Sequence, residues 1–341
     1  MDLIKITPPD DKLMWDIWMS RYQLSVVTIA DEIGFFRHLQ SSSLTLAKLA
    51  EVLILSERAV EVLAEILIGL GFLKKIGKKV NLTQIAKTYL LPNSPFYWGA
   101  QLLGLRERIE HKQILEAITN ATHQLSYSGK QFTAMWEEGT ITAEAARNFT
   151  QKMHATILAP ALHAVKSGLF KATQNLLDVG GGSGCFSAAY VKYYPKSTAT
   201  VFELPTVGAV TKQYLQELSG TKKVSLYLGN FFTSPWPTGY DGVLFSQIFH
   251  DWPYEICKKL AEKAFDILPK GGHIYIHEML FNDAMTAPLT TACFDLLMLI
   301  NHRSQQFTKA ELFELLRAVG FKKIKAKQTF GYYSLVVAEK R

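Results

Sequence analysis

Leu-Leu-Asp-Val-Gly-Gly-Gly-Ser-Gly, residues 176–184, reads as an apolar strand that runs directly into a turn made almost wholly of glycine. Because glycine has no Cβ, such a turn can bend sharply and let a ligand lie against its backbone. A second apolar run, residues 200–203, ends in Glu203. A carboxylate about 20 residues after the turn can hold the two hydroxyls of a ribose. Together these features predict a nucleoside-binding site.

The spacing of the glycines narrows the choice of nucleoside. The dinucleotide fingerprint is G-x-G-x-x-G/A, whereas Gly180, Gly182 and Gly184 follow G-x-G-x-G, and Cys185 stands at the third dinucleotide position. The turn also lacks the lysine of a phosphate-binding P-loop. A nucleoside without phosphates therefore fits better, and S-adenosylmethionine is the common ligand of that kind.

From residue 175 onward, apolar strands alternate with helical stretches, which is the pattern of an α/β sheet. The last two strands have no helix between them, so we expect them to form an antiparallel pair at the edge of the sheet. The predicted strands are 175–179, 199–203, 224–229, 242–246, 273–277, and two near 322–328 and 332–338.

The first third of the chain has helical periodicity, followed by a hairpin. The pattern predicts helices at 15–39, 44–50 and 56–70 and two short strands within 72–82, which is the arrangement of a winged helix. A DNA-binding regulator is one interpretation, supported by lysines of the hairpin. The third helix, however, carries three glutamates and one arginine, the opposite of what phosphate contacts need. We therefore expect a module for packing and dimerisation, and no nucleic-acid partner.

Composition excludes several other classes of protein. The 341 residues carry a net charge of +7 and three cysteines, which are too few and too scattered for a disulfide framework or a cysteine-based zinc site. No apolar run reaches the about 18 residues of a membrane-spanning helix, and the first residues are too polar for a signal peptide. These observations predict a cytoplasmic protein without a membrane partner.

Five short motifs stand in the second half of the chain. They are Asp178-Val-Gly-Gly-Gly-Ser-Gly184, Phe202-Glu-Leu-Pro205, Gly229-Asn-Phe-Phe232, His250-Asp-Trp-Pro253 and Ile267-Leu-Pro-Lys-Gly-Gly272. In this combination they resemble the class I S-adenosylmethionine-dependent small-molecule O-methyltransferases, the family of the caffeic acid and acetylserotonin enzymes. The resemblance extends over roughly residues 12–340.

This resemblance implies the fold and the domains. The expected fold is α/β: a Rossmann-like methyltransferase domain, with a mostly parallel seven-stranded sheet and an antiparallel edge strand, preceded by a mainly helical winged-helix domain. We expect the winged-helix dimerisation domain in residues 1–105, a helical linker that contributes to the acceptor pocket in 106–170, and the methyltransferase domain in 171–341. The partners implied are a small-molecule acceptor and a second copy of the chain.

The resemblance also implies which residues bind S-adenosylmethionine. Gly180 and Gly182 would contact its methionine end through the backbone. Glu203 would bind the ribose, with Asn230 and Phe231 beside the adenine. The family usually has aspartate at position 230, so the contact made by Asn230 lacks a charge. The remaining implied cofactor-binding residues are Asp178, Leu204, Ser246 and Gln247.

His250 is the candidate general base. It follows a predicted strand, at the carboxyl edge where ligands of α/β sheets bind. A phenol titrates near pH 10, so a base beside the hydroxyl is useful at neutral pH. In the family two acidic residues flank this histidine; Glu278 matches the first, and the uncharged Gln306 stands at the second. The predicted catalytic residues for transfer to a hydroxyl are therefore His250, Glu278 and Gln306.

An alternative is metal-dependent C-methylation of a 2-oxo acid such as an aryl pyruvate. His250, Asp251 and His302 form a possible two-histidine, one-carboxylate set for a metal ion. Such a metal would acidify the carbon beside the ketone and favour its enolate. For either reaction, the residues expected to line the acceptor pocket are Phe149, Met153, Trp252, Phe294, Met298 and His302.

Overall fold

The structure is a computed structural model and describes residues 7–119, 127–218, 220–301 and 304–341. The chain forms two compact units. The sheet unit comprises residues 1–11, 132–280 and 307–341, and the helical unit comprises residues 12–131 and 281–306. Each unit therefore draws on segments that lie far apart in the sequence, and each is described by itself.

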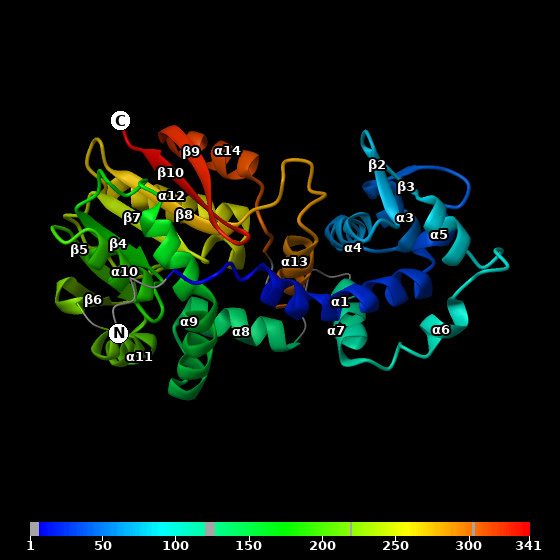
Figure 1. Ribbon diagram of the computed structural model, residues 1–341, viewed down its shortest axis with the longest axis horizontal. Coiled ribbons are helices and arrows are strands. Elements are labelled where there is room, and N and C mark those ends of the chain that lie inside the picture. Colours follow the sequence, from blue (N-terminus) through cyan, green and yellow to red (C-terminus); the bar gives the residue numbers. More distant parts are fainter. Residues whose placement is uncertain (1–6, 120–126, 219, 302–303) are drawn as a thin grey trace. The chain divides into compact units, whose positions relative to one another are not determined.

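The sheet unit is built on a seven-stranded sheet in the order β6-β5-β4-β7-β8-β10-β9 (Figure 1). The first five strands in this order pair in parallel, while β10 pairs antiparallel with both β8 and β9. The strands are β4 (Asn175–Val179), β5 (Thr198–Glu203), β6 (Val224–Leu228), β7 (Gly242–Ser246), β8 (His273–Met279), β9 (Lys322–Phe330) and β10 (Tyr333–Glu339). The predicted strands and the antiparallel edge pair are confirmed.

Helices cover both faces of this sheet. Successive residues of a strand point to opposite faces, so Leu177 packs with α12 and α14, whereas Leu176 packs with α9 and α10. Burial of each such side chain stabilises the fold by about 1.5–3 kcal/mol. The helices are α9 (Ala143–Lys166), α10 (Cys185–Tyr193), α11 (Pro205–Glu217), α12 (Tyr254–Ile267) and α14 (Lys309–Val319), with 3-10 turns η2 (Thr221–Lys223) and η3 (Phe249–Asp251).

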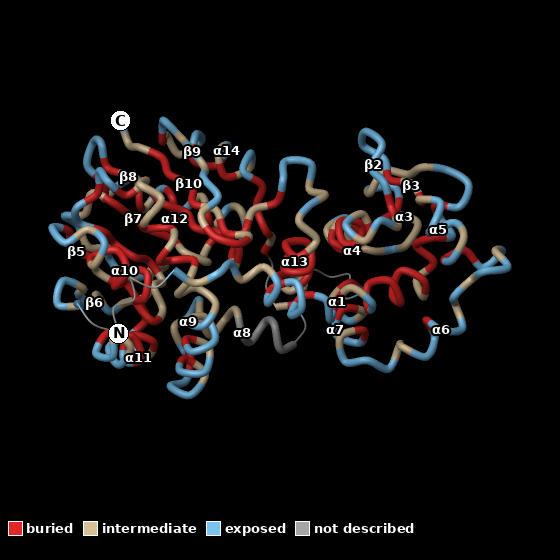
Figure 2. Tube along the Cα trace, in the orientation of Figure 1, coloured by how far each residue is buried: buried red, intermediate tan, exposed pale blue. Residues whose placement is uncertain are grey.

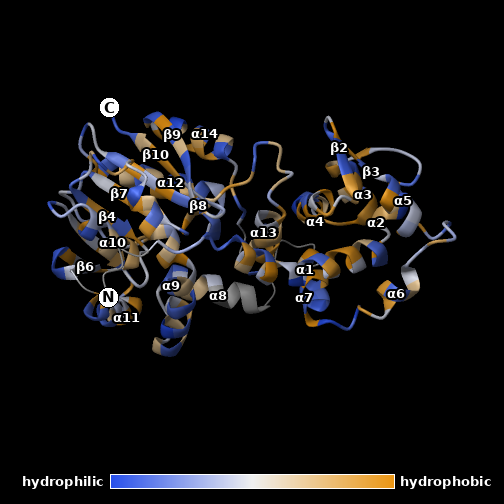
Figure 3. Cartoon of the chain, in the orientation of Figure 1, coloured by the Kyte–Doolittle hydropathy of each residue, from blue (hydrophilic) through white to orange (hydrophobic). Residues whose placement is uncertain are grey.

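The helical unit holds a three-stranded antiparallel sheet in the order β1-β3-β2. Figure 3 shows its helix α4 largely in the hydrophobic colour, in agreement with a helix buried along most of its length. The elements are α1 (Lys12–Glu32), α2 (Phe35–His38), β1 (Leu44–Thr45), α3 (Leu46–Leu53), α4 (Glu57–Gly69), β2 (Leu73–Ile76), β3 (Lys79–Leu82), α5 (Gln84–Tyr89), α6 (Gly99–Leu103), α7 (Ile109–Thr119) and α13 (Leu289–Asn301). Helix α8 (Tyr127–Glu138) spans the boundary at residue 132.

Local sequence signals explain where several of these elements begin and end. Ser56 caps α4, because its hydroxyl accepts the backbone N–H of Ala59 at 3.1 Å. The single helix expected at 15–39 is instead two, because Gly34 adopts φ 76° and separates α1 from α2. The hairpin of β2 and β3 turns at Gly77 as expected, and Figure 2 shows its tip exposed.

A buried ion pair ties α4 to α13 within the helical unit. One guanidinium nitrogen of Arg58 lies 2.6 Å from Oδ1 of Asp295, a residue that is completely buried. The carboxyl of Glu65 is buried beside this pair, and burial, with the nearby charge of Asp295, holds its pKa well above the usual range. Arg58 therefore lies beside two buried acidic side chains, Asp295 and Glu65.

Candidate active site

The expected site residues of the sheet unit gather at the carboxyl ends of the parallel strands. The glycine turn follows β4, Glu203 ends β5, Asn230 and Phe231 follow β6, and His250 follows β7. Because neighbouring parallel strands end at the same edge of the sheet, residues from four segments meet there. This is the edge at which open α/β sheets bind their ligands.

The glycine turn needs the freedom of its glycines at two positions. Gly180 has φ 68°, and a Cβ there would lie 2.5 Å from Cδ1 of Ile248. Gly182 has φ 55°, yet a Cβ there would meet nothing within 4 Å. Gly180 therefore allows close packing behind the turn, while Gly182 faces open space in which a ligand can lie.

Glu203 is aligned by the glycine turn itself. Its Oε2 accepts the N–H of Gly182 at 3.0 Å, and its Oε1 accepts the N–H of Leu204 at 2.8 Å. Burial raises the pKa of this carboxyl to about 7, even though both N–H groups favour its charged form. Each oxygen keeps a lone pair for a further donor, so the group fits the two hydroxyls of a ribose.

Asp178 supports the turn from beneath. It is fully buried, and its Oδ2 accepts the hydroxyl of Ser187 on α10 at 2.7 Å. Burial raises the pKa of Asp178 to about 6. A Cβ on Gly181 would lie 2.8 Å from this carboxyl group, so the turn packs directly on it. In the structure Asp178 thus shapes the turn.

The carboxamide of Asn230 makes two contacts inside the protein. Its Nδ2 donates to the carbonyl of Glu137 at 2.8 Å, and its Oδ1 accepts the N–H of Phe232 at 2.8 Å. The neighbouring Phe231 belongs to an aromatic cluster with Phe232 and Trp252. This side of the site is therefore largely apolar and suits a flat base.

The carboxylate of Glu278, on β8, accepts three hydrogen bonds and forms an ion-pair contact with His250. Its Oε1 accepts the backbone N–H groups of Ile248 and Phe249 at 3.1 and 3.0 Å. Its Oε2 accepts the side-chain amide of Gln247 at 2.9 Å and lies 3.0 Å from Nδ1 of His250. These contacts hold the buried carboxylate in one orientation.

His250 lies in the short turn η3 and is 5% exposed. Its Nε2 lies 3.4 Å from a carboxylate oxygen of Asp251. Burial lowers the pKa of His250, but the negative charges of Glu278 and Asp251 outweigh this effect and raise the pKa to about 9. A histidine held by a carboxylate at Nδ1 can accept a proton at Nε2 once its ring is neutral.

Reasoning from the sequence missed the contacts that Gln247 and Ser246 make at the carboxyl edge of the sheet. Gln247, expected to touch the cofactor, has φ 57° and directs its amide to Glu278. A positive φ at a residue other than glycine is strained and often marks a functional site. Ser246 lies 3.1 Å from Nδ1 of His277, a buried histidine whose pKa is lowered to about 3 by burial.

Gln306 belongs to the helical unit. Its backbone N–H donates to Oδ1 of Asp295 at 2.7 Å. The side chain is completely buried, and its amide has no hydrogen-bond partner among the described residues. A role for Gln306 beside His250 stays a prediction.

The expected pocket residues divide between the two units. Phe149, Met153 and Trp252 belong to the sheet unit, whereas Phe294 and Met298 lie on α13 of the helical unit. His302 lies outside the described residues.

Among the residues that the structure describes, no group of three or more histidines, cysteines or carboxylates is placed to hold a metal ion. No described helix is long and apolar enough to cross a membrane.

Comparison with known proteins agrees with this geometry. The O-methyltransferase domain family matches residues 111–322. The chain is 26% identical over 333 residues to a 3-hydroxy-5-methyl-1-naphthoate 3-O-methyltransferase of Streptomyces sahachiroi, covering 94% of this chain and 92% of that protein. It is 28% identical over 268 residues to the acetylserotonin O-methyltransferase of Bos taurus, covering 76% of this chain and 75% of that protein.

Solved structures share the fold. An O-methyltransferase family 2 protein of Planctomyces limnophilus, in complex with apigenin, superposes with a TM-score of 0.87 at 23% identity, over 100% of this chain and 99% of that one. Human N-acetylserotonin methyltransferase, in complex with S-adenosylmethionine, gives 0.61 at 24% identity over 96% of each chain. These matches give no support to the C-methyltransfer and DNA-binding alternatives. The chain belongs to the O-methyltransferase family, and it is an S-adenosylmethionine-dependent methyltransferase.

Proposed function

We propose that the enzyme methylates a hydroxyl group of a small aromatic or polycyclic acceptor, with His250 as the general base and Glu278 orienting it. One observation carries the assignment: Glu278 is fixed by three hydrogen bonds, and its Oε2 lies 3.0 Å from Nδ1 of His250. A carboxylate fixed in this way sets the orientation and tautomer of the ring. The ring nitrogen Nε2 is then the atom that receives the proton.

The residues that would hold S-adenosylmethionine have the chemical groups that its parts require. Glu203 keeps lone pairs for the ribose hydroxyls, Phe231 offers an aromatic surface to the adenine, and Gly182 opens the turn to the rest of the cofactor. The bound cofactor supplies an electrophilic methyl sulfonium. The protein therefore needs to align the acceptor and remove its proton.

The pKa values suit this proton transfer. A phenol titrates near pH 10, and the pKa of His250 is raised to about 9. Because the two pKa values are similar, the free energy of proton transfer from the acceptor hydroxyl to Nε2 is small. The positively charged methyl sulfonium of a bound cofactor would lower the pKa of His250 and so favour the neutral ring that can act as a base. Glu278 stabilises the imidazolium that forms.

The test begins with acceptors suggested by the relatives' names: a hydroxynaphthoate, N-acetylserotonin and the flavone apigenin. With an accepted compound, His250→Ala should lower kcat at least a hundredfold, while calorimetry shows unchanged affinity for S-adenosylhomocysteine. Glu262→Ala, a substitution on the helix α12 away from the glycine turn, is the matched control. Turnover by His250→Ala close to that of the wild type would remove the base assignment.

We also propose that the enzyme is a homodimer. One end of α1 carries apolar side chains that are strongly exposed in the single chain: Leu13 68%, Met14 68% and Ile17 60%. Such a cluster favours burial against another protein surface, and a second copy of the chain is the expected occupant. Light scattering that gives the mass of a monomer at micromolar concentration would contradict this. The cytoplasmic location stays a prediction.

A further inference from the structure

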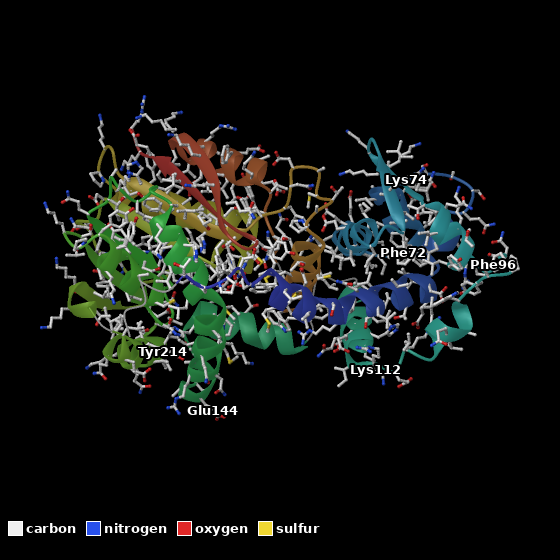
Figure 4. The ribbon with its side chains drawn as sticks, in the orientation of Figure 1. Phe72, Lys74, Phe96, Lys112, Glu144 and Tyr214 are labelled. Carbon is white, nitrogen blue, oxygen red and sulfur yellow. The ribbon has the colours of Figure 1, made fainter. Side chains whose placement is uncertain are left out.

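Lys263, on α12, contacts the loop after β6, and the proposed mechanism does not use these contacts. Its ammonium group donates to the backbone carbonyl of Phe231 at 2.9 Å and to that of Phe232 at 2.6 Å. The indole N–H of Trp236 also donates to the carbonyl of Phe231, at 2.8 Å. Helix α12 covers one face of the sheet, whereas α9, on which Figure 4 labels Glu144, covers the other. The loop is therefore held from the side of α12.

The ammonium group of Lys263 depends on these carbonyls. The side chain is half-buried, and burial lowers the pKa of Lys263 without an opposing effect from a carboxylate. Lys263 forms no ion pair with any of the described residues, and its Nζ lies 5.9 Å from the centroid of the Trp236 ring. A partly buried charge needs hydrogen-bond partners, and bonds from a charged donor are stronger than those between neutral groups. Lys263 therefore holds the loop firmly.

The contacts of Lys263 set the direction of the peptide unit that joins Phe231 and Phe232. This peptide is trans, so its C=O and N–H groups point to opposite sides. Because the carbonyl of Phe231 is turned toward Lys263, the N–H of Phe232 points the other way and donates to Oδ1 of Asn230 at 2.8 Å. The carboxamide nitrogen of Asn230 donates in turn to the carbonyl of Glu137. Lys263 therefore orients Asn230 through a single peptide unit.

The loop presents a ring and a carboxamide at the carboxyl edge of the sheet. The ring of Phe231 reaches the glycine turn, because its Cε1 lies 3.6 Å from the position that a Cβ on Gly180 would take. The carboxamide of Asn230 keeps one N–H and one lone pair after its two contacts. An aromatic surface and a polar group beside it suit a purine base. The sheet order places β5, with Glu203, next to β6, so a nucleoside whose ribose lies on Glu203 can place its base on this loop.

We propose that Lys263 is a positioning residue for the base of S-adenosylmethionine. It holds the loop after β6 in the conformation in which Phe231 and Asn230 contact the adenine, and it acts through the peptide rather than by touching the cofactor. A carboxamide at position 230 suits this arrangement, since a carboxylate could not donate to the carbonyl of Glu137. The inference rests on the cofactor site of the proposed function, but not on the identity of the general base or of the acceptor.

Calorimetry with two ligands tests the proposal without an acceptor. S-adenosylhomocysteine and 5′-methylthioadenosine share the adenine and the ribose, and only the first has the amino-acid arm. Lys263→Met keeps an aliphatic side chain and removes the donors. It should weaken both ligands by a similar factor of about ten. Lys263→Arg, whose guanidinium can donate to both carbonyls, should restore both affinities to within about threefold of the wild type.

Lys340→Met is the matched control. Lys340 also donates to a backbone carbonyl of α12, that of Phe265, and its Nζ lies 4.6 Å from the centroid of the Phe265 ring. The substitution therefore removes the same kind of contact from the same helix, but not from the loop after β6. It should leave both affinities unchanged. Equal weakening by Lys340→Met and Lys263→Met would overturn the proposal, since it would show that any loosening of α12 disturbs the site.

Three other results would also overturn the proposal. Unchanged binding of both ligands by Lys263→Met would show that the loop keeps its conformation without the lysine. Weakening of S-adenosylhomocysteine alone would place the loss in the amino-acid arm rather than in the base. Failure of Lys263→Arg to restore binding would show that the two carbonyl contacts are not what matters.

A second variant covers the case in which Lys263→Met does not fold. Trp236→Phe keeps a ring and removes the other donor to the carbonyl of Phe231. It should weaken both ligands about threefold, and unchanged affinities would contradict the proposal. If the wild-type enzyme binds neither ligand, the cofactor site itself is wrongly assigned. Binding of S-adenosylhomocysteine by the wild type separates that failure from a failure of the positioning role.

Discussion

Replacing Glu278 by glutamine should remove a pH-dependent part of the stability of the enzyme. In the folded protein the pKa of His250 is raised from 6.5 to about 9, and Glu278 is the largest cause of that rise. In the unfolded chain the pKa returns to about 6.5. A group whose pKa is higher in the folded state stabilises the fold below the unfolded pKa, and this contribution is lost as the pH rises through the folded pKa.

The size of the effect follows from these pKa values. Each pKa unit corresponds to about 1.4 kcal/mol, so raising the pKa of His250 from 6.5 to about 9 contributes about 3 kcal/mol at pH 6. This stabilisation should disappear between about pH 6.5 and 9.5 in the wild type. In Glu278→Gln most of it is absent at every pH, because burial lowers the pKa and only Asp251 opposes this.

Urea unfolding at pH 6 and pH 9.5 measures the difference. Other groups titrate in this range too, and burial raises the pKa of Glu203 to about 7. Subtracting the variant from the wild type cancels these shared contributions. We expect the wild type to lose about 2–3 kcal/mol more than the variant over this interval. Parallel loss of stability in the two proteins would refute the ion pair between His250 and Glu278.

Three further predictions follow from the packing. Gly180→Ala places a Cβ 2.5 Å from a neighbouring side chain and should weaken S-adenosylhomocysteine at least tenfold in calorimetry; unchanged affinity would contradict the tight packing. Arg58→Met leaves the buried carboxylate of Asp295 without its cation and should destabilise the helical unit by about 3–5 kcal/mol in urea unfolding; a loss below about 1 kcal/mol would contradict it. Gln247→Asn tolerates the positive φ but cannot reach Glu278, so kcat should fall about tenfold with cofactor affinity unchanged.

The elements of this fold could be predicted because their signals are local. The run 176–184 reads as strand and turn from neighbouring residues alone, and Ser56 marks the start of a helix through a bond to a residue three positions away. Gly34 is also a local signal, and the prediction of one helix over residues 15–39 did not use it. The carboxyl-edge placement of Glu203 and His250 also follows from the sequence, because parallel strands bring their ends to one edge.

The partners of the buried polar groups could not be predicted in this way. Arg58 meets Asp295 on a helix more than 200 residues later, and His154 on α9 meets Ser183 in the turn after β4. Gln247 contacts Glu278 only because β7 and β8 are neighbours in the sheet. A strand or helix is specified by the periodicity of adjacent residues. The choice of hydrogen-bond partner depends on which elements pack together, and only the tertiary structure decides that.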